Sequence, residues 1–226
     1  MRFDLITIFP KMFDCYINES ILKRAQKKKL IKINVYDLRG WATDKHKTVD
    51  DKPYGGGPGM VMKVETFYRA LQALKNQKLR SKNKGTRIIL TSAKGKQFTQ
   101  DDARRLAKYK QVIILCGRYE GVDERVAEHL ADEEISVGPY VLTGGELPAM
   151  IMVDAISRHI PGVLGKAESL EETRQAKSYK LKAISSSLEY PQYTRPEKFR
   201  KWKVPKVLLS GNHQKIEEWR RKMARK

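Results

Sequence analysis

Three glycine-rich segments contain most of the residues that could form a ligand site. They are Asp50–Met60, Gly117–Gly121 and Ser136–Pro148, and the second directly follows the apolar run Val112–Cys116. Glycine lets the backbone approach a ligand closely, or adopt positive φ, without a clash from Cβ. Three such segments in one small domain predict a composite site that holds a compact ligand through backbone N–H and C=O groups.

The same segments do not match two common phosphate-binding motifs. Gly55–Met60 lacks the Lys-Ser/Thr of a P-loop, and none of the segments fits G-x-G-x-x-G. Nucleoside triphosphate hydrolysis and ordinary dinucleotide binding are therefore disfavoured. The two cysteines, Cys15 and Cys116, and four scattered histidines predict neither a disulfide framework nor a metal cluster.

A helix is predicted after the third glycine segment, and it carries a candidate functional arginine. One face of this helix is apolar, with Ala149, Val153, Ile156 and Ile160. Pro148 suits its first turn, and Glu146 suits the positive end of the helix dipole. Arg158 lies about 200° round the helix from Ile156, away from the apolar face. Its simplest interpretation is an i, i+4 surface pair with Asp154.

Short β-branched runs alternate with helical patterns along the part of the chain that carries these residues. The predicted strands are Phe3–Phe9, Ile31–Tyr36, Arg87–Leu90 and Val112–Cys116. The predicted helices between them are Ile21–Lys28, Glu65–Leu74 and Thr99–Tyr109. This alternation is typical of an α/β fold with a largely parallel sheet, in which ligands bind at the carboxyl ends of the strands.

Charge indicates the class of partner. The 226 residues include 46 Lys and Arg against 26 Asp and Glu, a net charge of +20. Residues 166–226 alone hold 17 basic and 7 acidic residues, and the aromatic side chains among them include Tyr190, Tyr193, Phe199, Trp202 and Trp219. Aromatic rings among Lys and Arg suit stacking on unpaired bases beside phosphate contacts, so nucleic acid is the predicted partner.

A membrane location is disfavoured. The apolar runs are much shorter than the roughly 20 residues of a spanning helix. The first apolar stretch contains Asp4 and lacks the cleavage site of a signal peptide. We therefore expect the protein in a reducing cytoplasm.

Taken together, six segments resemble the tRNA (guanine-N1)-methyltransferase family that acts at position 37 of tRNA, a branch of the SPOUT superfamily. The resemblance is nearly continuous from residue 1 to about 165 and then resumes in fragments. The matching segments are Asp50–Met60, Gly117–Arg125, Tyr140–Met150, Pro161–Gly165, Tyr193–Pro196 and Val207–His213.

The resemblance implies an α/β fold with a parallel sheet tied in a deep trefoil knot, in an obligate homodimer whose active sites lie at the subunit interface. It implies S-adenosylmethionine as the methyl donor, bound bent within the knot. By position, the residues that bind it would be Leu90, Thr91, Ser92, Gly117, Tyr119, Glu120, Ser136, Val137, Gly138, Pro139, Tyr140, Val141, Leu142, Gly144 and Gly145. Pro139 stands where the family usually has Asp.

The resemblance also implies a division of catalytic work. Guanine N1 is protonated at neutral pH, so a carboxylate must take its proton while a cation near O6 stabilises the developing negative charge. Arg158 matches the family arginine at O6, an assignment that replaces its interpretation as a surface ion pair. The guanine-binding loop would contain Pro58, Gly59 and Met60, with Asp50 nearby.

The expected general base is a departure from the family. Counting from Gly165 puts Thr173 where the family has its aspartate, and Glu171 and Glu172 precede it. We expect Glu172, or Glu171 with a shift of one residue, to act as the base; the alternative is that both are solvated carboxylates and the base lies elsewhere. The family also implies Mg²⁺, although no carboxylate cluster in the sequence marks its site.

We expect three parts: a knotted catalytic domain at 1–165, a charged linker at 166–187, and a short, mainly helical, basic unit at 188–226 that binds tRNA. Family members usually continue well beyond Ser210–His213, so this last unit would be reduced. Two alternatives stay open: a related knotted methyltransferase with a different RNA target, and an RNA-binding protein without enzymatic activity.

Overall fold

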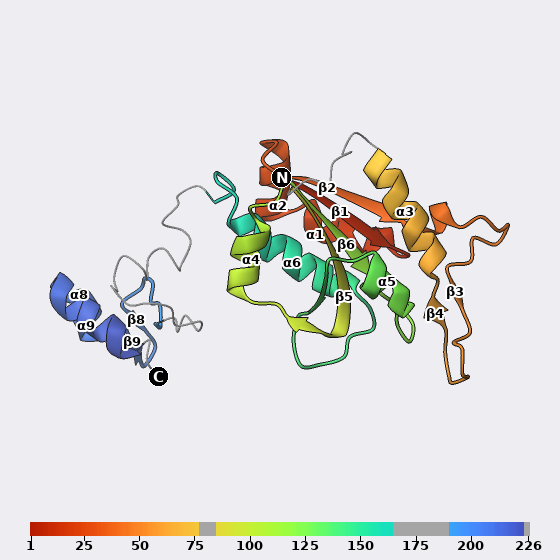
Figure 1. Ribbon diagram of the computed structural model, residues 1–226. Helices are drawn as coiled ribbons and strands as arrows, with labels where there is room; N and C mark the ends of the chain where they lie inside the picture. Colours follow the sequence, from red (N-terminus) through yellow and green to blue (C-terminus); the bar gives the residue numbers. More distant parts are fainter. Residues whose placement is uncertain (77–84, 165–189, 224–226) are drawn as a thin grey trace. The chain divides into compact units, whose positions relative to one another are not determined.

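The computed structural model describes residues 1–76, 85–164 and 190–223. The chain divides into two compact units, Met1–Leu170 and Glu171–Lys226 (Figure 1). Each unit is described by itself. The segment expected to be a linker, 166–187, lies outside the described residues.

A five-stranded parallel sheet forms the centre of the first unit, in the order β2-β1-β6-β5-β7. Its strands are β1 (Arg2–Thr7), β2 (Lys32–Asp37), β5 (Thr86–Gln97), β6 (Gln111–Cys116) and β7 (Glu133–Ser136). The predicted α/β class with a parallel sheet is therefore confirmed. The predicted strands correspond to four of these five, and β7 was missed.

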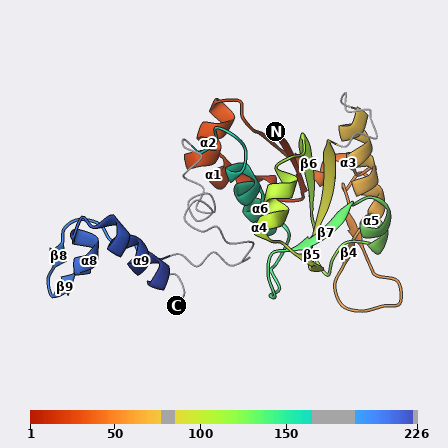
Figure 2. The ribbon, with the colours of Figure 1, turned by 60° about the vertical axis from the view of Figure 1, so that its left-hand side comes forward.

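Helices cover both faces of the sheet (Figure 2). One face carries the short α1 (Asp14–Ile17), α2 (Ser20–Lys27), α4 (Gln100–Leu106) and α6 (Glu146–Arg158); the other carries α3 (Val64–Asn76) and α5 (Glu124–His129). Successive side chains of a strand point to opposite faces of the sheet, so each strand contributes to the hydrophobic core on both faces. In β6, Val112 and Ile114 face one helix layer, whereas Ile113 and Leu115 face the other. These strands read as continuous apolar runs because both of their faces are buried.

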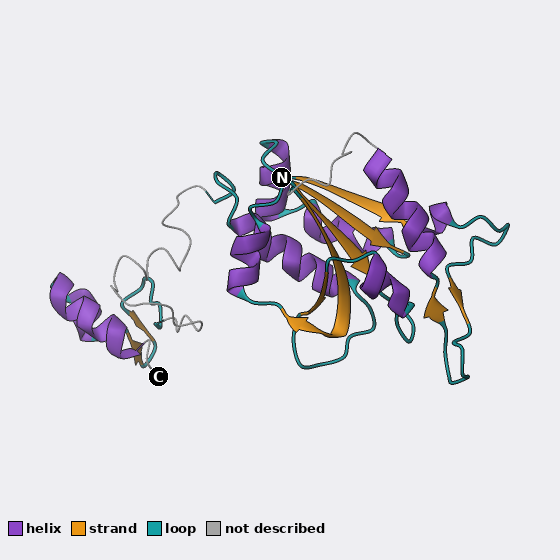
Figure 3. Ribbon diagram, viewed as in Figure 1, coloured by secondary structure: helices purple, strands orange, loops and turns teal. Residues whose placement is uncertain are grey.

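Smaller elements lie around this sheet (Figure 3). The 3₁₀ turns η1 (Pro10–Phe13) and η2 (Leu38–Trp41) follow β1 and β2, and β3 (Asp50–Asp51) pairs antiparallel with β4 (Val61–Met62). The first glycine segment forms the long loop between β3 and β4.

The described part of the second unit, residues 190–223, contains a hairpin and two helices. Its elements are β8 (Lys198–Phe199), β9 (Trp202–Lys203), α8 (Lys206–Leu209) and α9 (His213–Met223). The expectation of a mainly helical unit therefore omitted the β8–β9 hairpin, because strands of two residues leave no periodic pattern in a sequence.

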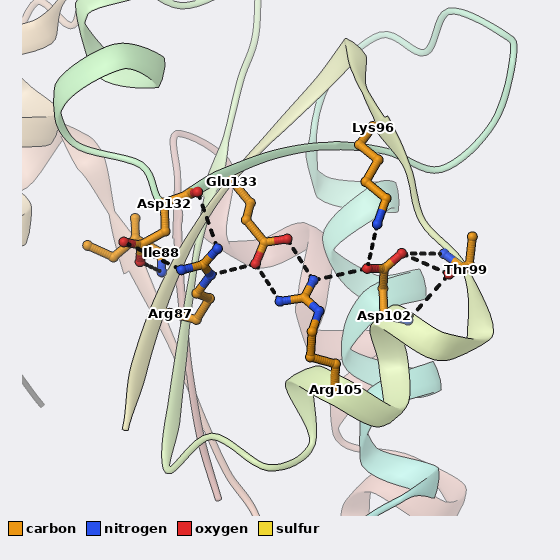
Figure 4. Close-up of polar contacts among 8 residues, drawn as sticks. All are labelled: Arg87, Ile88, Lys96, Thr99, Asp102, Arg105, Asp132 and Glu133. Atoms are coloured by element: carbon orange, nitrogen blue, oxygen red, sulfur yellow. Dashed lines mark hydrogen bonds and ion pairs between the residues drawn. The ribbon is translucent and has the colours of Figure 1, made fainter. Parts of the chain in front are cut away.

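An ion-pair network explains why β7 was missed (Figure 4). The strand begins with two glutamates, an unusual start for a half-buried strand. The Glu133 carboxylate accepts hydrogen bonds from Arg105 at 2.7 and 2.6 Å and also pairs with Arg87. The Arg105 guanidinium continues to Asp102 of α4 at 3.0 Å. These pairs compensate the charge that the strand would otherwise bury, and they link β5, β7 and α4.

Asp102 is the most heavily bonded carboxylate of this network. It forms a capping box with Thr99 at the start of α4 and accepts a hydrogen bond from Lys96 at 3.1 Å. Burial by itself would raise the pKa of the Asp102 carboxyl, but hydrogen bonds from Arg105, Thr99 and Lys96 outweigh it and lower the pKa from 3.8 to about 2.

We predict that Asp102→Asn lowers the free energy of unfolding by about 1 to 3 kcal/mol at neutral pH, because it removes a helix cap and a buried charge partner. Since the folded pKa lies below the unfolded value, the stability that Asp102 contributes is present above about pH 4 and is lost as the pH falls through about 2. Urea unfolding at several pH values measures the difference between wild type and variant.

Asp101→Asn is the matched control. Asp101 is an exposed neighbour on the same helix, with only an i, i+3 pair to Arg104, so the change is expected to be less than about 0.5 kcal/mol. A stability difference between wild type and Asp102→Asn that did not shrink in acid would contradict the assignment.

Candidate active site

A cleft of about 470 Å³ opens at the carboxyl ends of β5, β6 and β7. Three loops form it: the bulged end of β5, the loop after β6, and the long loop between β7 and α6. This is the edge of a parallel sheet at which ligands bind. Its volume lies in the range of small-molecule sites, about 300 to 1,000 Å³.

Thirteen of the fifteen residues expected to bind the cofactor line this cleft. They are Leu90, Thr91, Ser92, Gly117, Tyr119, Glu120, Ser136, Val137, Tyr140, Val141, Leu142, Gly144 and Gly145. The other two, Gly138 and Pro139, belong to the same loop but do not line the cleft. An added Cβ at Gly138 would lie 2.3 Å from the outer ring atoms of Tyr140, so a larger residue there would require this exposed side chain to move.

Glycine at position 145 is required by a close approach of backbones. A Cβ added to Gly145 would lie 1.9 Å from Thr91 Oγ1, and 2.8 Å from both Cys116 Cα and the backbone nitrogen of Gly117. The Gly145 N–H donates to the Gly117 carbonyl at 2.8 Å, which joins the third loop to the second. Thr91 donates to the Leu115 carbonyl at 3.0 Å and so adds β5 to the same junction.

A buried ion pair that sequence reasoning did not find supports this junction. The Arg118 Nε donates to Glu146 Oε2 at 2.9 Å, and Thr7 donates to Glu146 Oε1 at 2.7 Å. Glu146 is only 1 % exposed. From the sequence, Glu146 was expected only to interact with the helix dipole. Its partner Arg118 lies in the Gly117–Gly121 segment, which was predicted to belong to the site. Nothing in the sequence indicated that the two side chains would pair.

Arg118 also reaches two further elements. Its Nη1 donates to the Thr143 carbonyl at 3.1 Å, and its guanidinium carbon lies 4.8 Å from the centre of the Phe9 ring. One side chain thus connects the loop after β6, the loop before α6 and the segment after β1. The cleft wall is fixed by these contacts.

Other charged residues that were not predicted also line the cleft. Lys94 pairs with Glu124 and lies 3.8 Å from Glu134, and all three contribute to the lining. The ion pair with Glu124 is the largest contribution to a raised pKa of Lys94, so the ammonium is charged at neutral pH. The cleft therefore combines apolar and backbone surfaces with charges of both signs.

The predicted substrate residues lie beside the cleft. Asp50 belongs to β3, whereas Pro58, Gly59 and Met60 close the β3–β4 loop; none of the four lines the cleft. The Glu120 N–H donates to the Met60 carbonyl at 3.0 Å. A Cβ at Gly59 would lie 2.4 Å from the Glu120 side chain. The glycine loop is therefore attached to the loop after β6.

Arg158 lies far from the cleft of its own chain. It is the last residue of α6, thirteen positions from Gly145, which is about 20 Å along a helix axis. It lines a second groove, mostly apolar and of about 540 Å³, with Cys15, Tyr16, Leu147, Met150, Ile151, Asp154 and Ala155.

Tyr16 links α1 to this groove. Its hydroxyl donates to Asp154 Oδ2 at 2.9 Å. Burial, and secondly the bond to Asp154, raise the pKa of Tyr16. The other proposed catalytic residues, Glu171 and Glu172, lie outside the described residues.

Residues 1–76, 85–164 and 190–223 show neither a membrane-spanning helix nor a metal-binding cluster. No helix among them is long and apolar enough to cross a membrane. Within residues 1–76, 85–164 and 190–223, no group of three or more His, Cys, Asp or Glu side chains is placed to hold a metal ion.

Comparison with known proteins connects this geometry to one family. The model of the tRNA (guanine-1)-methyltransferase family, TrmD, matches residues 1–226. A tRNA (guanine-N(1)-)-methyltransferase of Citrifermentans bemidjiense is 52 % identical over 222 residues, covering 98 % of this chain and 84 % of the relative. Its counterparts from Geobacter sulfurreducens and Thermomicrobium roseum are 50 % and 51 % identical; the matches cover 99 % of this chain and 86 % and 79 % of those relatives.

Proposed function

Because the chain belongs to the tRNA (guanine-1)-methyltransferase family, we propose that it transfers a methyl group from S-adenosylmethionine to N1 of guanosine 37, next to the anticodon of tRNA. The observation that carries this proposal is the three-loop cleft, because thirteen of the fifteen residues that the family motifs imply for the cofactor site line it. Its position at the carboxyl ends of parallel strands is the position at which such folds bind nucleotides.

The residues present in the cleft fit S-adenosylmethionine. Leu90, Val137 and Leu142 offer apolar surface for an adenine ring, and the glycine backbones offer hydrogen-bond donors and acceptors. Glu120, Glu124 and Glu134 lie on the lining and would favour a ligand with positive charge. When bound, the cofactor supplies a methyl group already activated on a sulfonium.

The remaining chemistry belongs to side chains of the protein. We assign Arg158 to the O6 atom of guanine, where its guanidinium stabilises the negative charge that develops as N1 loses its proton. We assign the acceptance of that proton to Glu172 or Glu171. The loop with Asp50, Pro58, Gly59 and Met60 would hold the base, and its attachment to the loop after β6 supports a position beside the cofactor. The family also implies Mg²⁺, to which we assign no ligand.

The distance between Arg158 and the cleft supports a homodimer with shared active sites. About 20 Å of helix separates them within one chain, so a second copy is needed to bring an arginine to the cofactor. Exposed apolar side chains surround the groove that Arg158 lines. Met12, Tyr16, Leu147 and Ile151 are each between 38 and 49 % exposed, which suits burial against a partner.

The chain path supports the knot that the family implies. β7 lies at the sheet edge beside β5, yet α6 directly after it packs against β1 and β6. We propose that the segment through Gly165 completes a trefoil knot.

The proposed domain organisation has three parts. Residues 1–165 form the catalytic domain, residues 166–187 are a linker, and residues 188–226 bind tRNA. We further propose a cytoplasmic location, where tRNA is modified.

Methyl transfer to a tRNA transcript tests the function directly. Labelled methyl groups are expected to pass to a transcript with guanine at position 37, and not to the same transcript with adenine there. Equal labelling of both transcripts would support a related enzyme with another RNA target. Titration calorimetry with S-adenosylmethionine supplies the control, since a protein that only binds RNA would bind no cofactor.

The base assignment predicts that Glu172→Gln or Glu171→Gln lowers kcat for methyl transfer by about 100-fold or more, because the amide cannot accept the N1 proton. The Kd for S-adenosylmethionine is expected to stay unchanged. Glu168→Gln, in the same segment, is the matched control and should retain activity. Near-normal transfer by both variants would exclude both glutamates as the base.

Mixing two inactive variants tests the shared site. Arg158→Ala removes the guanidinium, and Leu142→Trp fills the cleft so that cofactor binding is lost. If Arg158 of one chain serves the cleft of the other, a mixed dimer contains one intact site, and random mixing restores about a quarter of wild-type activity. No recovery after subunit exchange would show that each chain uses its own arginine.

A further inference from the structure

The described aromatic side chains of the second unit differ in exposure. Tyr193 and Trp219 pack against each other with ring centroids 6.2 Å apart, and the Arg220 guanidinium lies 5.1 Å from the ring centre of Tyr190. These rings take part in packing within the unit. Trp202 also makes contacts, and it is 69 % exposed, compared with 49 % for Tyr193. The sequence could not distinguish it from the others, since all lie among Lys and Arg.

Trp202 lies in a very short β-hairpin. β8 and β9 pair antiparallel, with Phe199 opposite Trp202, and Arg200 and Lys201 form the turn. Arg200 adopts φ of 56°, a conformation that tight hairpin turns require. The labelled β8 and β9 strands can be followed beside α8 in Figure 2.

The charges on this hairpin are arranged unfavourably for the protein alone. Lys198 lies directly opposite Lys203 in the antiparallel pair, and like charges in this position destabilise a sheet. Arg200 and Lys201 add two further cations at the turn, which makes four within six residues. A two-stranded hairpin has little stability of its own. An anion that neutralises the facing lysines would therefore stabilise this hairpin.

An exposed indole beside dense positive charge matches one class of ligand. Single-stranded nucleic acid offers flat bases for an aromatic ring and phosphates for cations. Double-stranded RNA hides its bases in stacked pairs, so it would engage the lysines but not the ring. An acidic protein would satisfy the lysines without needing the flat face of an indole. An RNA with unpaired bases fits both features.

We propose that the β8–β9 hairpin is a base-stacking element for tRNA, in which the Trp202 indole stacks on an unpaired base while Lys198 and Lys203 contact flanking phosphates. This inference rests on the proposed function only in naming tRNA as the RNA. It adds a specific residue and a specific mode of recognition to the tRNA-binding role of residues 188–226.

The test measures the Kd of the full chain for an unmodified tRNA transcript at several salt concentrations. Trp202→Leu is expected to raise the Kd about tenfold, the effect of losing one stacked base. The slope of log K against log salt should stay unchanged, because no phosphate contact is lost. Trp202→Phe should recover most of the affinity, since a flat ring is restored.

The double variant Lys198→Ala/Lys203→Ala is expected to show the complementary pattern. Its salt slope should become shallower by about one to two, because each phosphate contact contributes nearly one. A blunt RNA duplex should bind wild type and Trp202→Leu equally. Tyr68→Leu, which removes a half-exposed aromatic ring from α3, is the matched control and should leave the Kd for tRNA unchanged.

Two outcomes would overturn the proposal: wild-type affinity in Trp202→Leu, or a Trp202→Phe variant as weak as Trp202→Leu. Titration with S-adenosylmethionine checks each variant, because an intact cleft shows that the first unit is folded. Failure of the proposed function looks different. It would appear as absent methyl transfer by wild type, whatever the binding results for Trp202.

Discussion

The backbone of Gly145 lies so close to the ends of β5 and β6 that a side chain at this position would overlap Thr91, Cys116 and Gly117. The cleft depends on this close approach. It brings the loop before α6 against the loop after β6, and a backbone hydrogen bond between Gly145 and Gly117 holds them there. The cleft is therefore the space between loops that already pack against one another at this junction.

Charge burial reinforces the junction. Glu146 begins α6 with almost no exposure, and its carboxylate is divided between Arg118 and Thr7. Burying the Glu146 carboxylate without partners would lower the free energy of unfolding by more than the ion pair raises it. The main effect of the pair is therefore to fix the geometry of the loops and not to add stability. Because Arg118 also binds the Thr143 carbonyl, the same charge pair sets the position of the third loop. The ion pairs of Glu133 with Arg105 and Arg87 likewise fix geometry, because they hold β7 beside β5.

The two regions to which we assign the chemistry lie in separate places of one chain. The cleft lies at the start of α6, and Arg158 lies at its end in an apolar groove. A straight helix cannot bring its own two ends together, so a catalytic centre that needs both is better built from two copies. The proposed homodimer follows from this length, and the exposed apolar residues around the groove are consistent with it.

The sequence by itself determined the α/β class, and its resemblance to the family named thirteen of the residues that line the cleft. Continuous apolar strands predict a sheet buried on both faces, and glycines after strands mark where backbone must approach a ligand. It failed for β7, because the charge of Glu133 is compatible with a half-buried strand only when Arg87 and Arg105 from other elements pair with it. It also failed for the Arg118–Glu146 pair and could not single out Trp202. Local periodicity and glycine placement are properties of neighbouring residues, so a sequence displays them directly. Contacts between segments that are distant in the sequence determine which charged residues form ion pairs and which aromatic rings stay exposed. Only the tertiary structure could therefore show them.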